Sequence, residues 1–141
     1  MKFVYVFSAI LTLLFGSIAW AQAPDPVQRN NSRAVWFENW IGLENANMRV
    51  ASPDGEIRDV FSEQGTPVYE LTGAAPDGVY RYELRAQTDE LVKNRNYSSN
   101  NISGEEKEFV PKAFYRSGVF VVRGGAILRP EEMQEEEEER E

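Results

Sequence analysis

The chain has 141 residues, a formal net charge of −8, and neither cysteine nor histidine. Its length suits one domain, and the missing residue types exclude disulfides, Cys/His zinc sites, thiol nucleophiles, Ser-His-Asp triads and histidine general bases. Residues 131–141 contain eight Glu and one Arg, so residues 22–130 carry a charge of only −2 with the two signs interspersed. Without a clustered basic face, nucleic acid is excluded as a partner.

The N-terminal segment has the layout of a secretory signal peptide. Lys2 precedes an apolar run from Phe3 to Ile18, and the small-residue box Ala19-Trp20-Ala21 follows. The run is a little short for a membrane-spanning helix, so we favour a cleaved signal peptide over the alternative of an uncleaved anchor. We expect residues 1–21 to be removed after Ala21, with membrane contact only before cleavage. The mature chain would then be periplasmic, secreted or at the cell surface of a diderm bacterium.

Residues 22–33 are polar and contain prolines without an apolar period, so we expect a flexible leader. Residues 34–130 then alternate short β-branched and aromatic runs with Gly, Pro, Asp and Asn clusters, which predicts a single β-sandwich domain. In the first run, residues 34–43, strand alternation would place Val35, Phe37 and Ile41 on one face. Trp36 and Trp40 would share the opposite face.

Trp36 and Trp40 are the candidate binding residues. Four residues apart on one strand, they would lie about 13 Å apart on the same face. Exposed indoles at that spacing could stack on sugar rings. The alternative is that one or both pack in the core or at a sheet edge, as aromatic side chains commonly do. Their exposure in the structure distinguishes the two hypotheses.

Two hairpins and a half-buried strand are predicted further along the chain. Residues 48–51 and 57–61 flank a Pro-Asp-Gly turn, and residues 66–71 form a further short strand. Within residues 79–86, Tyr80, Tyr82, Leu84 and Ala86 alternate with charged residues. Residues 87–112 are polar and are expected to form a long loop. Residues 114–123 and 126–128 flank Gly124-Gly125, a two-residue hairpin signal.

The acidic residues do not form a recognisable site. Asp54, Glu56 and Asp77 lie at Pro-Asp-Gly turns, where turn formation explains them better than calcium binding. We expect no metal or cofactor and no enzymatic activity. A small carboxylate-dependent hydrolase would need two acids opposed across a cleft.

Residues 131–141 form a Glu-rich tail. Its five consecutive glutamates at 135–139 repel one another, so we expect it to be disordered or partly helical. It would serve as a solubilising segment or as an arm for a basic partner.

Two strand motifs carry a resemblance to a known family. Pro76-Asp-Gly-x-Tyr-x-Tyr-x-Leu-x-Ala86 and Ser117-Gly-x-Phe-x-Val-x-x-Gly125 resemble the last two strands of bacterial immunoglobulin-like and fibronectin-like modules of secreted proteins. They are similar to the immunoglobulin-like domain of the flagellar-hook-cap type. The resemblance covers about fifty residues and implies an all-β, immunoglobulin-like sandwich without assigning functional residues.

These features together predict an exported, non-catalytic binding or structural accessory module that contacts another exported protein. Its sheet edges and the Gly124-Gly125 hairpin are where another chain could add a strand. A carbohydrate-binding module that uses Trp36 and Trp40 on a cell-surface polysaccharide is the first alternative, and a small hydrolase is the second.

Overall fold

The computed structural model describes residues 23–97 and 107–129, so the predicted signal peptide and the Glu-rich tail lie outside the described residues. The described part is all-β. None of its segments forms a helix long and apolar enough to cross a membrane.

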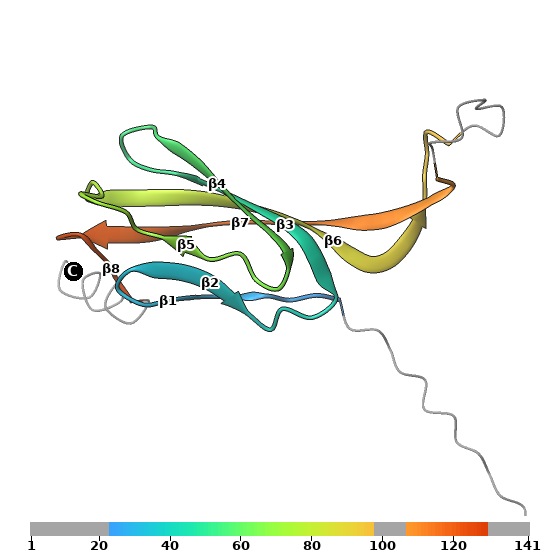
Figure 1. Cartoon of the computed structure of the whole chain (residues 1–141), viewed down its shortest axis with the longest axis horizontal. Helices are drawn as coiled ribbons and strands as arrows, with labels where there is room; N and C mark the ends of the chain where they lie inside the picture. The colour runs from blue at the N-terminus through green and yellow to red at the C-terminus, as the bar shows by residue number, and fades with distance from the viewer. Residues whose placement is uncertain (1–22, 98–106, 130–141) are drawn as a thin grey trace, which may run out of the picture.

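The strands form two antiparallel sheets that face one another. The elements of the described residues are β1 (Val27–Asn30), β2 (Ala34–Glu38), β3 (Leu43–Ala51), β4 (Ile57–Gln64), β5 (Tyr69–Glu70), β6 (Gly78–Lys93), β7 (Phe109–Arg123) and β8 (Ala126–Ile127). One sheet has the order β1-β2-β5, and the other has the order β4-β3-β6-β7-β8. The three-stranded sheet lies along one side of the larger sheet, which gives a sandwich-like fold (Figure 1).

The alternation predicted in β6 is confirmed. Tyr80, Tyr82, Leu84 and Ala86 are buried, and the charged residues between them are exposed. The ring of Tyr80 stacks on that of Phe120 with a centroid distance of 5.0 Å. The core therefore lies between the inner face of β6 and β7 and the smaller sheet.

Both predicted hairpins are confirmed. β3 pairs with β4 around the turn at residues 52–56, where Ser52 N donates to Glu56 O at 2.9 Å. β7 pairs with β8 around Gly124 and Gly125, whose φ angles of 59° and 76° match the positive values that a tight hairpin turn requires.

The prediction of a flexible leader over residues 22–33 is wrong where β1 forms. Val27–Asn30 pairs antiparallel with β2. Its polar side chains also have partners across the sandwich, since Gln28 Nε2 donates to Val119 O at 3.2 Å and Asn30 Nδ2 donates to Leu128 O at 3.1 Å. A strand held by polar contacts has no apolar period, so its sequence does not predict it.

The predicted long loop over residues 87–112 is also wrong at both ends. β6 continues to Lys93 and β7 begins at Phe109, and beyond a register shift after Gln87 the two strands project as a two-stranded arm (Figure 1). In this arm Val92 pairs with Val110, and Lys112 Nζ lies 2.9 Å from Glu90 Oε2. Cross-strand pairs and an ion pair thus order a polar sequence.

The predicted strand at residues 66–71 is shorter in the structure. β5 contains only Tyr69 and Glu70, which pair with Val35 and Ala34 of β2. The segment before it packs by other means, because Pro67 is buried and Thr66 Oγ1 accepts a hydrogen bond from Phe37 N at 2.9 Å.

β1 and the end of β7 close one side of the sandwich. The guanidinium of Arg116 donates to Pro26 O and to the carboxylate of Asp25. The Tyr82 hydroxyl bonds to Gln28 Oε1 at 2.9 Å, and Ser32 O accepts from the backbone of β8. Residues near the two ends of the described chain therefore meet along one seam.

Candidate functional site

The structure does not bring Trp36 and Trp40 together on one strand face. β2 ends at Glu38, and Asn39 has a positive φ of 56°, so the chain turns before Trp40. Trp36 is half-buried on the side of β2 away from the core, between the inward-facing Val35 and Phe37. The turn also explains why Ile41, predicted to share a face with Val35 and Phe37, is 72% exposed while those two are buried.

Trp40 packs against the core instead of forming a platform with Trp36. Its ring lies 6.2 Å from that of Phe37, and its Nε1 is buried without a hydrogen-bond partner among the described residues. Residues 23–97 and 107–129 contain no group of three or more acidic side chains close enough to hold a metal ion. Trp36 and Trp40 therefore do not form a shared exposed surface, and the described acidic residues do not cluster into a metal site.

The outer face of the five-stranded sheet carries a different set of side chains. We use this name for the surface of β4, β3, β6 and β7 that points away from the smaller sheet. The strand register arranges its residues in three rows. These rows are Ile57, Ala51, Arg81 and Val119; then Asp59, Arg49, Glu83 and Ser117; then Phe61, Asn47, Arg85 and Tyr115.

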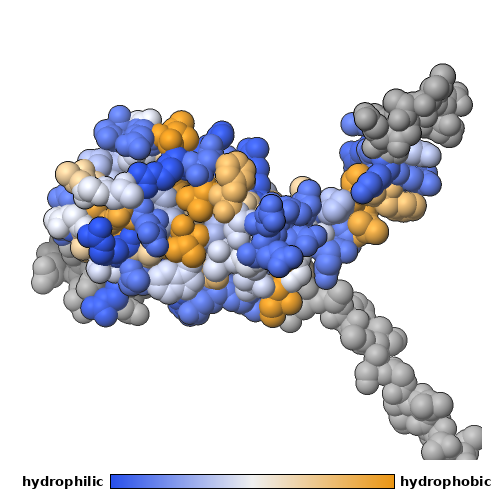
Figure 2. All heavy atoms as spheres, viewed as in Figure 1, coloured by the Kyte–Doolittle hydropathy of each residue, from blue (hydrophilic) through white to orange (hydrophobic). Residues whose placement is uncertain are grey.

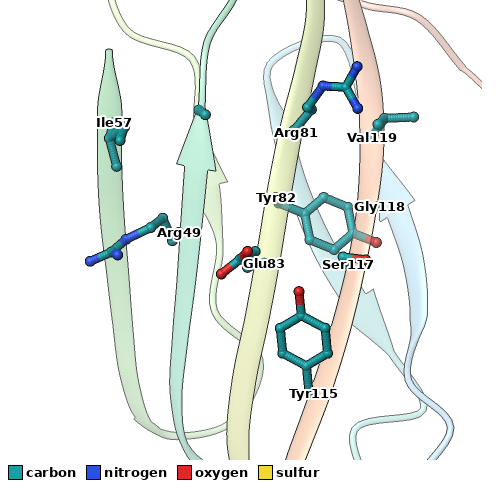
Figure 3. A pocket seen from close by; sticks show the side chains of 10 residues that line it. Arg49, Ile57, Arg81, Tyr82, Glu83, Tyr115, Ser117, Gly118 and Val119 are labelled. Atoms are coloured by element: carbon teal, nitrogen blue, oxygen red, sulfur yellow. The ribbon is translucent and has the colours of Figure 1, made fainter. Parts of the chain in front are cut away.

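A shallow groove of about 560 Å³ crosses this face. Arg49, Ile57, Arg81, Glu83, Tyr115 and Val119 are among the residues that line it. Figure 3 shows the Arg81 side chain extending from β6 towards Val119 on β7. Apolar side chains also reach the surface elsewhere on the sandwich and on the arm, interspersed with hydrophilic ones (Figure 2).

The middle of the outer face is charged and internally paired. Arg49 donates two hydrogen bonds to the Asp59 carboxylate, at 2.8 and 3.0 Å. These bonds lower the pKa of Asp59 and raise that of Arg49. Arg85 lies 3.3 Å from Glu83 and also sits over the Tyr115 ring, 5.9 Å from its centroid.

The row of the groove that begins with Ile57 contains a charged side chain that has no partner among the described residues. Arg81 makes no ion pair or hydrogen bond within the described part of the chain. Its neighbours in the row include Ile57 and Val119, which are 61% and 43% exposed. A free guanidinium between exposed apolar side chains is suited to a partner that offers both apolar surface and a hydrogen-bond acceptor.

The edge of β7 is open beside this face. β8 pairs only with Val122 and Arg123, while the Val121 carbonyl accepts from Leu128 and the Val119 carbonyl accepts from Gln28. From Phe109 to Ser117, no described residue bonds to the backbone of β7 on the side that points away from β6, although the Arg116 side chain bonds to Pro26 and Asp25. An unpaired strand edge is a ready template for another strand.

The Asp59–Arg49 pair makes stability depend on pH. Because folding lowers the pKa of Asp59, the contribution is present above the unfolded pKa, about 3.9, and is lost as the pH falls through the lower folded value. We expect Asp59→Asn to show a smaller loss of stability than wild type between about pH 4 and pH 2.

Denaturant unfolding at several pH values measures this difference. Glu63→Gln, on the same strand, is the control because Glu63 has no ion pair among the described residues. Parallel pH profiles for Asp59→Asn and wild type would contradict the prediction.

The described residues thus define an all-β, sandwich-like domain with an open sheet edge beside an exposed face of mixed charge. Comparison of the chain with protein-family models, with curated proteins and with solved structures gives no match. The sequence predicted sheet edges and the Gly124-Gly125 hairpin as contact points, and in the structure this hairpin joins β7 to β8, the end strand of the five-stranded sheet. The outer face and the length of the free edge depend on strand register, for which the sequence has no local signal.

Proposed function

We propose that this chain is an exported, non-catalytic binding or structural accessory module that acts through protein–protein contacts in the periplasm or at the cell surface. The observation that carries the proposal is the unpaired edge of β7 from Phe109 to Ser117. A partner strand can add to such an edge through backbone hydrogen bonds, with specificity from neighbouring side chains. The outer face supplies those side chains next to the edge.

The immunoglobulin-like type of the sandwich is part of this proposal. The pairing of β6 with β7 supports it, because this pairing places the two motifs that resemble immunoglobulin-like strands side by side. The packing of a second sheet against their inner face is the further support. The absence of histidine and cysteine supports a non-catalytic role.

Site-specific crosslinking in the native cells tests the proposed function. A photoreactive phenylalanine analogue replaces Tyr115, which is 56% exposed beside the open edge, and in a second strain it replaces Val68, which is 43% exposed before β5. We expect discrete protein adducts from position 115 and none from position 68. Equal labelling at both positions, or recovery of polysaccharide alone, would argue against a protein-binding edge.

A further inference from the structure

The open edge of β7 matches a second copy of itself. Building on the proposed function, we propose that Phe109–Ser117 of two molecules pair antiparallel about a two-fold axis at Ala113. The occupant of the edge is then another copy of this chain, and the two larger sheets become one continuous sheet. The argument rests on backbone direction, on register and on the charges of β7.

Backbone direction sets which residues of β7 can pair. In an antiparallel strand, the N–H and C=O of one residue point to the same neighbour, and consecutive residues alternate sides. The carbonyls of Val119 and Val121 point away from β6, since they accept bonds from Gln28 and from Leu128. By alternation, Ala113, Tyr115 and Ser117 also present their backbone groups to the open side.

The existing contacts of β7 limit the length of the pairing. A register centred on Tyr115 would use Val119 and Val121, whose carbonyls are already bonded within the sandwich. A register centred on Ala113 ends at Ser117 and leaves those contacts in place. It spans the full length of the free edge.

Charge disfavours the neighbouring registers, even though Lys112 and Arg116 each have an ion-pair partner, Glu90 and Asp25, within the chain. β7 contains two charged residues in this segment, Lys112 and Arg116, and both are cationic. Centring the pair on Phe114 places Lys112 opposite Arg116 of the second copy, and centring it on either charged residue places that residue opposite itself. Like charges directly opposite one another destabilise a strand pair. The Ala113 register places Lys112 opposite Phe114 and Arg116 opposite Val110.

The same register covers exposed apolar surface of the arm. Tyr115 faces Pro111 of the second copy, whose carbonyl can accept the Tyr115 N–H although proline has no N–H to donate. Phe109 faces Ser117 at each end. Phe109 and Tyr115 are 52% and 56% exposed in the single chain, and each gains a neighbouring strand in the pair.

The position of the sandwich is also compatible with pairing. β8 lies at the end of the molecule away from the arm, whereas Ala113 lies on the arm side of β7 (Figure 1). β8 therefore lies away from the proposed axis in both copies. An isologous contact of this kind closes as a dimer and does not extend into a filament.

Sedimentation of the exported chain over a range of concentrations tests the proposal. We expect a reversible dimer, and we expect Ala113→Lys to raise its dissociation constant by about tenfold or more because two lysines then lie opposite one another. Val79→Lys is the matched control, since Val79 is 46% exposed on the outer face of β6 and away from the edge. Mixing Ala113→Lys with Ala113→Glu should restore dimers, which separates lost pairing from lost folding.

Disulfide trapping tests the register, because the chain contains no cysteine of its own. Ala113→Cys should form a covalent dimer on oxidation, and Ser117→Cys should do so only when mixed with Phe109→Cys. Wild type that stays monomeric at all concentrations, or preferential crosslinking of Ser117→Cys to itself, would overturn the proposal. A monomer that still yields protein adducts at position 115 would remove the second copy as partner and leave the proposed binding function intact.

Discussion

Replacing Phe120 by alanine is expected to cost about 3–5 kcal/mol of unfolding free energy, the range found for removing a buried phenylalanine. Phe120 is 2% exposed and stacks on Tyr80. Its ring also lies 5.7 Å from that of Tyr69, which belongs to the opposite sheet. Removing it would leave a cavity between the two sheets that the close-packed surroundings can fill only in part.

Chemical denaturation followed by near-ultraviolet circular dichroism measures this loss. Val68→Ala is the control, since that side chain is exposed before β5, away from the proposed edge, and its replacement should change stability by no more than about 0.5 kcal/mol. A cost below about 1 kcal/mol for Phe120→Ala would contradict the packing described, because removing a closely packed phenylalanine costs about 3–5 kcal/mol.

Gly118→Ala is expected to destabilise the fold by about 1–3 kcal/mol, the usual cost of overpacking a core. Gly118 lies opposite Tyr82 in the β6–β7 pair. A Cβ at this position would lie 2.6 Å from Tyr82 Cζ. The ring cannot easily swing away, because its hydroxyl is bonded to Gln28 and its edge packs on Phe37 at a centroid distance of 5.5 Å.

The sign of the stability change distinguishes steric overlap with Tyr82 from the ordinary preference of a strand for alanine over glycine. In an ordinary strand, alanine is more stable than glycine by roughly 0.5–1 kcal/mol. Gly118→Ala in a Tyr82→Leu background should therefore lose most of its penalty, and a double-mutant cycle measures that coupling. Ser117→Ala, one residue earlier and exposed, should have little effect. A stabilising Gly118→Ala would show that the Tyr82 ring is not held against β7.

The sequence predicted the elements whose side chains alternate. β6 was recognisable because Tyr80, Tyr82 and Leu84 face one side and arginines and a glutamate face the other. The turn at Gly124-Gly125 was recognisable because glycine tolerates positive φ. In both cases the physical cause lies within a few consecutive residues.

The elements that could not be predicted are stabilised by residues distant in sequence. β1 has the sequence Val-Gln-Arg-Asn and is held by Val119 and Leu128. The arm depends on pairs such as Leu91 with Pro111. The positive φ of Asn39 changed the direction of the chain and separated Trp36 from Trp40, a feature to which no apolar pattern points.

The sequence predicted that the candidate surface would include a sheet edge, but not which strand would form it. That a sandwich has sheet edges follows from its class. That β7 also has a free edge, and that its open part ends at Ser117, follows from the shortness of β8 and from the Gln28 contact to Val119. These are consequences of tertiary packing, so local sequence analysis could not assign them.

The seam between β1 and the end of β7 also constrains when the domain can fold. Gln28 bonds to Val119, and Asn30 bonds to Leu128, so the contacts that close the sandwich join positions 91 and 98 residues apart. A chain that crosses a membrane from its N-terminus onward would expose β1 long before its partners arrive. Contacts so distant in sequence slow folding. If the chain is exported as proposed, its early segments need to remain unaggregated until almost all of its sequence has been delivered, and the rate of translocation then influences folding yield.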